Sequence, residues 1–132
     1  MKLYSRGFSL VEVLAAVAII GIIVFLALPN VIQAKLDTEE QMVITRAEAL
    51  NMSISAYITA NGRSNAGAAW AHANNSTHAA KYLLVKGYMA YAPSSLATTT
   101  TEPGYQPNGY TFEFGSLDQK VVVKRNTTAI PY

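Results

Sequence analysis

Cysteine is absent from this chain of 132 residues. No disulfide can therefore join its segments, and no thiol chemistry is available to it. Charge is also scarce, because ten basic and eight acidic residues leave a formal net charge of only +2. So small a net charge implies no overall polyelectrolyte partner. The core of any folded domain must hold together by packing alone.

Acidic residues are scarcest in the second half of the chain. Calcium sites need several oxygen ligands, usually carboxylates gathered in one loop, and no such loop lies near the end of the sequence. Beyond Gly62 this part is mildly basic, with six basic and three acidic residues: Arg63, Lys81, Lys86, Lys120, Lys124 and Arg125 against Glu102, Glu113 and Asp118.

Patterns typical of catalytic sites are missing too. His72 and His78 are the only histidines, and two imidazoles without a carboxylate at ligand spacing are a weak metal signal, so they indicate solvated loop residues. The spacing of Gly62 and Gly67 is that of a phosphate loop, but alanines stand where Lys-Ser/Thr is needed. No serine has a nucleophile-elbow context, and no paired carboxylates occur in the second half. We therefore expect no enzyme, no metal and no cofactor.

The most informative feature is an apolar run from Phe8 to Leu28 that contains one acid, Glu12. As a helix the run spans roughly 30 Å, one hydrocarbon thickness of a bilayer. A carboxylate near a bilayer centre costs about 2.5–3.5 kcal/mol. Lys2 and Arg6 precede the run, which favours a cytoplasmic N-terminus.

Three interpretations of this segment compete. A secretory signal would be cut after a small-x-small site such as Ala16-Val17-Ala18, and a plain membrane anchor would stay uncut. Both leave Glu12 unexplained. The third is a leader cut between Gly7 and Phe8, which creates a free amine at Phe8. Glu12 would then lie four residues along the same helix and face the same side.

The sequence Gly7-Phe8-Ser9-Leu10-Val11-Glu12, followed by a long apolar helix, resembles the leader of type IV pilins and pseudopilins. The resemblance covers roughly residues 1–62 and includes Gly21, Pro29 and Asn30. It implies that a prepilin peptidase cuts after Gly7 and that Phe8 becomes N-methylated.

The resemblance also implies a function and a location. The chain would be a structural subunit, held in the inner membrane before assembly and then incorporated by an assembly platform, with related pilins, into an extracellular or periplasmic filament. Parallel packing of the helices would pair Glu12 with the Phe8 amine of a neighbouring subunit. The alternative for Glu12 is an interfacial residue that reaches the lipid headgroups. Alternatives for the chain are a pseudopilin of type II secretion and a DNA-uptake or adhesive minor pilin.

Two departures from the family bear on these alternatives. Major pseudopilins of type II secretion carry a calcium site near the C-terminus, and no acidic loop here matches it. Some pilins close their C-terminal loop with a disulfide, which this chain cannot form.

The predicted organisation has four parts: a leader (1–7), a membrane or filament-core half-helix (8–29), an amphipathic half-helix (30–62) and a small head (63–132). Pro29 removes one backbone hydrogen bond and should kink or loosen the helix, or else separate two helices. Asn61-Gly62 is a plausible helix stop. The predicted amphipathic stripe consists of Ile32, Leu36, Val43, Ala47, Leu50, Ile54 and Ile58.

For the head, the sequence predicts a short helix and a β-hairpin, so the fold class is α+β and type IV pilin-like. Residues 63–76 indicate a loop with at most one short helical turn. Ser76 or Thr77 should cap a helix that ends at Val85, with Gly87 as its stop and an apolar face of Ala80, Leu83 and Leu84.

The hairpin strands are expected at 110–114 and 119–125, with any further strand from 88–98. A two-stranded hairpin is marginal in water, so Tyr110, Phe112 and Phe114 should pack on the helical stripe.

Lys120, Lys124 and Arg125 lie on or near the second predicted strand. Lys120 and Lys124 are an even number apart and would share a face. Together with Arg63, Lys81 and Lys86 they suggest a basic patch able to contact DNA phosphates. The alternative is a solvated edge strand that is kept charged against edge-to-edge aggregation.

Overall fold

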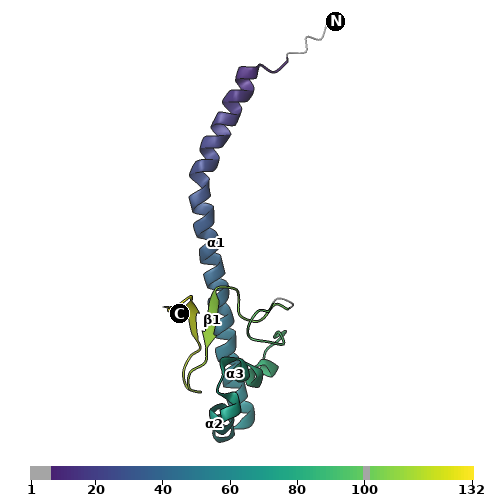
Figure 1. Cartoon of the computed structure of the whole chain (residues 1–132), viewed down its shortest axis with the longest axis vertical. Helices are drawn as coiled ribbons and strands as arrows, with labels where there is room; N and C mark the ends of the chain where they lie inside the picture. The colour runs from purple at the N-terminus through teal and green to yellow at the C-terminus, as the bar shows by residue number, and fades with distance from the viewer. Residues whose placement is uncertain (1–6, 100–101) are drawn as a thin grey trace. The chain divides into compact units, whose positions relative to one another are not determined.

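The computed structural model describes residues 7–99 and 102–132 (Figure 1). It is an α+β structure, as predicted, with a long apolar helix and a small antiparallel sheet. The chain divides into two compact units, one ending at Glu39 and one running from Glu40 to Tyr132. The helices and strands are α1 (Leu10–Asn61), α2 (Arg63–Ala71), α3 (His78–Val85), β1 (Tyr110–Glu113), β2 (Val122–Arg125) and β3 (Thr128–Ile130), with short 3-10 turns at Ala73–Asn75 and Lys86–Tyr88.

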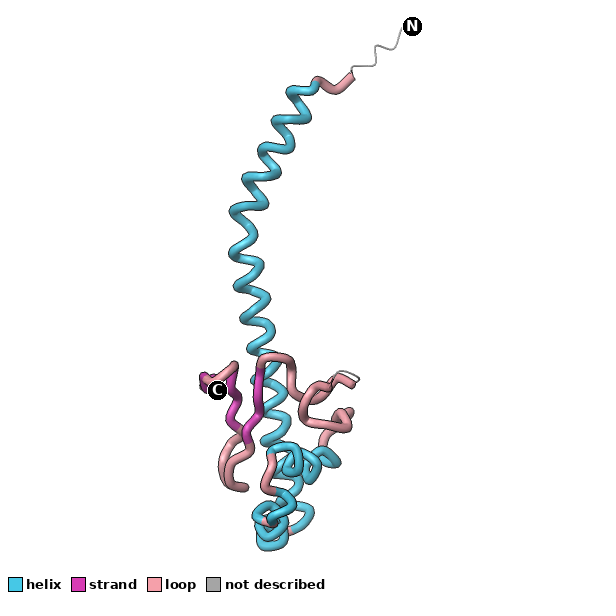
Figure 2. The backbone as a smooth tube through the Cα atoms, viewed as in Figure 1, coloured by secondary structure: helices cyan, strands magenta, loops and turns pink. Residues whose placement is uncertain are grey.

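Helix α1 begins close to the predicted position. The Ser9 carbonyl accepts hydrogen bonds from the backbone N–H groups of Glu12 and Val13, at 3.1 and 3.3 Å. The helix is continuous through Pro29 (Figure 2), so the alternative of two separate helices is wrong. A kink at Pro29 stays a prediction.

The second half of α1 supplies one wall of the core of the second unit. The predicted stripe is confirmed from Val43 to Ile54, with Ile58 partly buried at its end. Sequence reasoning missed Tyr57 and Ser53, which are also buried. Ser53 is tolerated there because its hydroxyl donates to the Leu50 carbonyl at 2.7 Å. The stripe does not begin as early as predicted, since Ile32 is exposed.

The sheet has the strand order β1-β2-β3, and both pairings are antiparallel. Phe112 lies opposite Val123, and Tyr110, Phe112 and Phe114 are all buried in the core, as the alternating pattern predicts. The third strand is β3, so the prediction of a strand within 88–98 is wrong. The turn after Arg125, with Asn126 at φ 57°, returns the C-terminal segment to β2.

Helix α2 corrects the prediction of a loop over 63–76. Gly62, at φ +76°, redirects the chain at the end of α1, and nine helical residues follow at once. Alanine-rich sequence favours this helix. It buries Ala66 and Trp70, which lie four residues apart on one face. The Trp70 indole N–H donates to the Gly115 carbonyl at 3.0 Å.

Helix α3 begins where the capping signal predicts. The Thr77 hydroxyl accepts from the Ala80 backbone N–H at 3.1 Å. The predicted apolar face is correct for Leu84, which packs against the core, but wrong for Leu83, which is 52% exposed while Tyr82 and Val85 are buried. The tyrosine ring supplies more buried area than the leucine, and its hydroxyl donates to the Pro93 carbonyl at 2.9 Å.

Asn51 links α1 to two other segments of the second unit. Its Oδ1 accepts from the Val121 backbone N–H at 2.9 Å, and its Nδ2 donates to the Tyr132 hydroxyl at 3.3 Å. We expect Asn51→Ala to lower the free energy of unfolding by about 1–3 kcal/mol, because it leaves a buried backbone donor without its partner. Denaturant titration of the full chain in detergent measures this. The control is Asn65→Ala, whose exposed side chain donates to the Asn61 carbonyl only four residues earlier. Equal midpoints for the two variants would contradict the linking role.

Tyr82 should make the second unit sensitive to alkali. Burial, and then the nearby Tyr105, raise the pKa of Tyr82 from 10.0 to about 12. The folded state therefore keeps a proton that the unfolded chain releases above pH 10, so the stabilisation is complete below pH 10 and is lost as the pH rises towards 12. At about 1.4 kcal/mol per pKa unit, the loss is on the order of 1–3 kcal/mol. Tyr82→Phe should flatten this decline in denaturant titrations at several alkaline pH values. Tyr91→Phe, at a fully exposed position, should not.

Candidate functional site

The predicted cleavage site lies outside α1. Gly7, Phe8 and Ser9 precede the helix in non-helical backbone, and Phe8 is 84% exposed. A Cβ placed on Gly7 would meet no heavy atom within 4 Å. Nothing in the described chain therefore requires glycine at this position.

Glu12 lies in the first turn of α1. It is the only charged residue between Phe8 and Leu28, and a carboxylate there interacts favourably with the positive end of the helix dipole. The expectation that Phe8 and Glu12 occupy one helix, a turn apart, concerns the cleaved chain and stays a prediction. In this uncleaved chain α1 begins at Leu10, so Phe8 is not on the helical face that carries Glu12.

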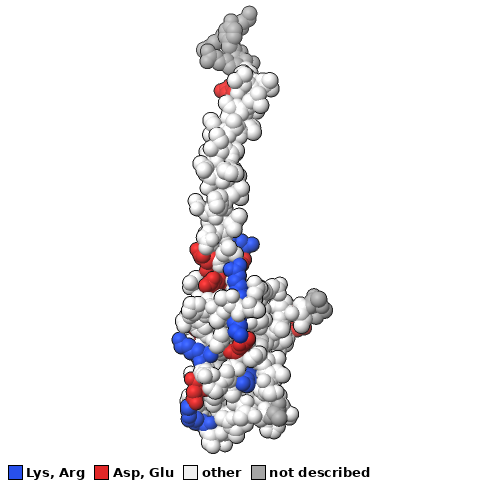
Figure 3. Space-filling model, turned by 60° about the vertical axis from the view of Figure 1, so that its left-hand side comes forward, with Lys and Arg blue, Asp and Glu red and all other residues white. Residues whose placement is uncertain are grey.

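The first half of α1 presents an unbroken apolar surface. Its large hydrophobic residues from Leu10 to Ile32 are each at least 50% exposed. Figure 3 accordingly shows this stretch almost entirely without charge. By length and composition α1 can cross a membrane. An apolar surface of this extent requires lipid or other apolar helices around it.

The predicted basic residues each contact a local partner. Lys124 forms an ion pair with Glu113 at 2.8 Å, and the Arg125 guanidinium lies over the Tyr110 ring. Lys120 precedes β2, so strand alternation does not place it on the Lys124 face as predicted. A DNA-binding patch stays a prediction, and these local contacts do not favour it.

The other cations of the predicted patch are also engaged. Arg63 pairs with Asp118, and the Lys81 ammonium donates to the Gly115 carbonyl at 3.0 Å and lies over the Trp70 ring. Lys86 donates to the Ser94 carbonyl at 3.4 Å.

The histidines have structural contacts within the second unit. The Phe114 backbone N–H donates to Nδ1 of His78 at 3.0 Å, and the two rings stack. His78 is the first residue of α3, so its assignment to a loop is wrong. Nδ1 of His72, just beyond α2, accepts from the Asn74 backbone N–H. Over residues 7–99 and 102–132 no three His, Cys, Asp or Glu side chains form a metal site.

A family model for the prokaryotic N-terminal methylation motif matches residues 2–28. The chain carries the signature of type IV pilin and pseudopilin precursors. This motif implies processing by a prepilin peptidase and assembly with other pilins, and it fits a membrane-anchored precursor. The match ends before the second unit begins. No curated protein and no solved structure gives a significant match to the chain.

Cleavage of the prepilin motif should depend on Gly7. We expect Gly7→Val to leave an uncut precursor in the membrane, because a branched side chain keeps the peptidase wall away from the backbone. Immunoblotting of membrane fractions measures the ratio of precursor to mature chain. Gly21→Val is the matched control, since Gly21 also has open space around it and should be processed normally. Normal maturation of the Gly7→Val chain would contradict the assignment.

Proposed function

We propose that this chain is a structural subunit of a type IV pilus-like filament. It is held in the inner membrane by α1 until the leader is removed, and is then incorporated by parallel packing of α1 helices. The mature filament lies outside the inner membrane, and the assembly platform of such systems inserts the subunits.

The observation that carries this proposal is the single carboxylate of Glu12 in an otherwise apolar, fully exposed helix segment. Cleavage after Gly7 creates an ammonium at Phe8. Each charge alone is costly in an apolar environment, and pairing reduces that cost. Two apolar helices can slide past one another with little preference. A buried pair between Glu12 of one subunit and the Phe8 amine of the next fixes the stagger, as a buried polar residue fixes coiled-coil register.

Electron microscopy of cells that carry or lack this chain tests the proposal. The expected result is a surface filament that antibodies against the second unit label, and that disappears on deletion. The methylation motif is common to pilins and pseudopilins. A periplasmic filament with a secretion defect would therefore favour the pseudopilin instead, and the absence of any filament would contradict both.

A further inference from the structure

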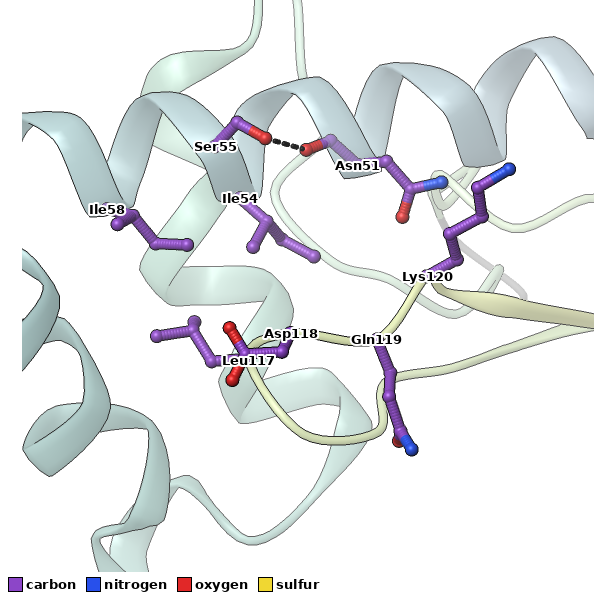
Figure 4. A pocket seen from close by; sticks show the side chains of 8 residues that line it. All are labelled: Asn51, Ile54, Ser55, Ile58, Leu117, Asp118, Gln119 and Lys120. Atoms are coloured by element: carbon purple, nitrogen blue, oxygen red, sulfur yellow. Dashed lines mark hydrogen bonds between the residues drawn. The ribbon is translucent and has the colours of Figure 1, made fainter.

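An open pocket of about 150 Å³ lies between α1 and the turn that follows β1 (Figure 4). Ile54 and Ile58 point from α1 toward Leu117 and Asp118 in that turn. Ile54, Ile58 and Leu117 form its apolar part, while the rest of the lining is polar: Asn51, Ser55, Asp118, Gln119 and Lys120. A cavity of about this volume, lined by aliphatic and aromatic side chains, accepts a single benzene ring. The pocket is therefore of the size that one aromatic side chain fills.

Tyr91 is an aromatic residue whose side chain does not pack into the core of the second unit. The side chain is fully exposed, and among residues 7–99 and 102–132 no hydrogen-bond or ring partner lies against it. Tyr88, three residues earlier, differs in both respects, because its hydroxyl accepts from Asn61 and its ring packs edge-on against Tyr57.

The backbone at Tyr91 adopts a conformation that is unfavourable for a bulky residue. Tyr91 has φ 57°, in the left-handed region that bulky residues rarely adopt. Such a conformation, when it supports no contact within the chain, points to a contact outside it.

Tyr91 and the pocket lie on different sides of the second unit. Tyr91 borders a separate open pocket that includes Arg46 of α1. At 3.6 residues per turn, Arg46 is roughly 130° around α1 from the centre of the face that carries Asn51, Ile54, Ser55 and Ile58. A contact between the ring of one copy and the pocket of another is therefore heterologous. Contacts of this kind propagate into helical filaments when they do not close into rings.

We propose that Tyr91 of one subunit inserts into the Ile54–Ile58–Leu117 pocket of a second copy of this chain. The ring covers the three aliphatic side chains. The hydroxyl donates to the Asp118 carboxylate, which lines the pocket and accepts from Arg63 through Oδ1. This contact rests on the proposed function, since it joins the heads of subunits in the same filament.

Engineered cysteines test this contact, because the chain contains no native cysteine that could react with the reagent. Chains with both Tyr91→Cys and Ser55→Cys are treated on cells with a short bifunctional thiol reagent. Each chain then carries one reactive thiol at position 91 and one at the pocket. Cross-linking should therefore give a ladder of dimers, trimers and longer species. A mixture of the two single variants should stop at dimers. The control pair is Leu83→Cys with Ser55→Cys, because Leu83 is also exposed.

Assembly of the wild-type chain separates the two proposals. Wild-type filaments with no ladder beyond that of the control pair would overturn the Tyr91 contact alone. Absence of wild-type filaments would overturn this contact and the proposed function together. As an independent readout, Tyr91→Ala should lower the amount of sheared filament about tenfold, as expected for loss of a buried aromatic anchor. An unchanged yield would also overturn the contact.

Discussion

A strain whose only copy of this chain carries Glu12→Leu should make no filaments, although it inserts and cleaves the precursor normally. The substitution makes the helix more apolar, so membrane insertion improves. The cleavage site at Gly7 and Phe8 lies outside α1 and is unchanged. Assembly fails because the Phe8 ammonium of each incoming subunit no longer meets a carboxylate. An unpaired buried charge costs about 3–5 kcal/mol, which corresponds to more than a hundredfold loss of filament.

Two further variants separate charge from shape. Glu12→Gln keeps the size of the side chain and removes its charge, and it should fail to assemble like Glu12→Leu. Val13→Leu changes the apolar surface beside it and should assemble normally. Electron microscopy and quantification of sheared filaments measure all three. Normal filament number and length in the Glu12→Leu strain would rule out the pairing role.

The second large effect is expected at the sheet. Phe112 is 1% exposed and lies opposite Val123 in the middle of the core. Phe112→Ala should cost about 3–5 kcal/mol, comparable to the whole stability of a small domain. The second unit should therefore lose its cooperative thermal transition, while the apolar first half of α1 should stay helical. Thr111→Ala, on the exposed face of the same strand, should change the melting temperature little. An unchanged melting temperature in Phe112→Ala would show that the strand does not pack as described.

The features that sequence predicted well are those with strong periodicity or a specific motif. The apolar run and the stripe from Val43 to Ile54 follow from helical spacing, and the alternation of Tyr110, Phe112 and Phe114 fixes which side of β1 faces the core. The Thr77 cap depends on one local hydrogen bond and was likewise predictable. The N-terminal methylation motif is a continuous stretch of sequence, so it can be recognised without any tertiary structure.

The features that sequence missed depend on contacts distant in the chain. Helix α2 has only nine residues, too few to be stable alone, so its placement depends on contacts such as that of Trp70 with Gly115, 45 residues away. The strand β3 is only three residues long and pairs because the turn at Asn126 returns it to β2. The role of Asn51 was invisible for the same reason, since its partners Val121 and Tyr132 lie about half the chain away.

The most direct test of the central claim is the mass of the mature N-terminus. Filaments or membranes from wild-type cells are digested, and the N-terminal peptide is identified by mass spectrometry. The proposed function predicts a chain that begins at Phe8 with an N-methylated amine. A mature chain that begins near Val17 or Ile19, as cleavage by a signal peptidase would leave it, would contradict the account.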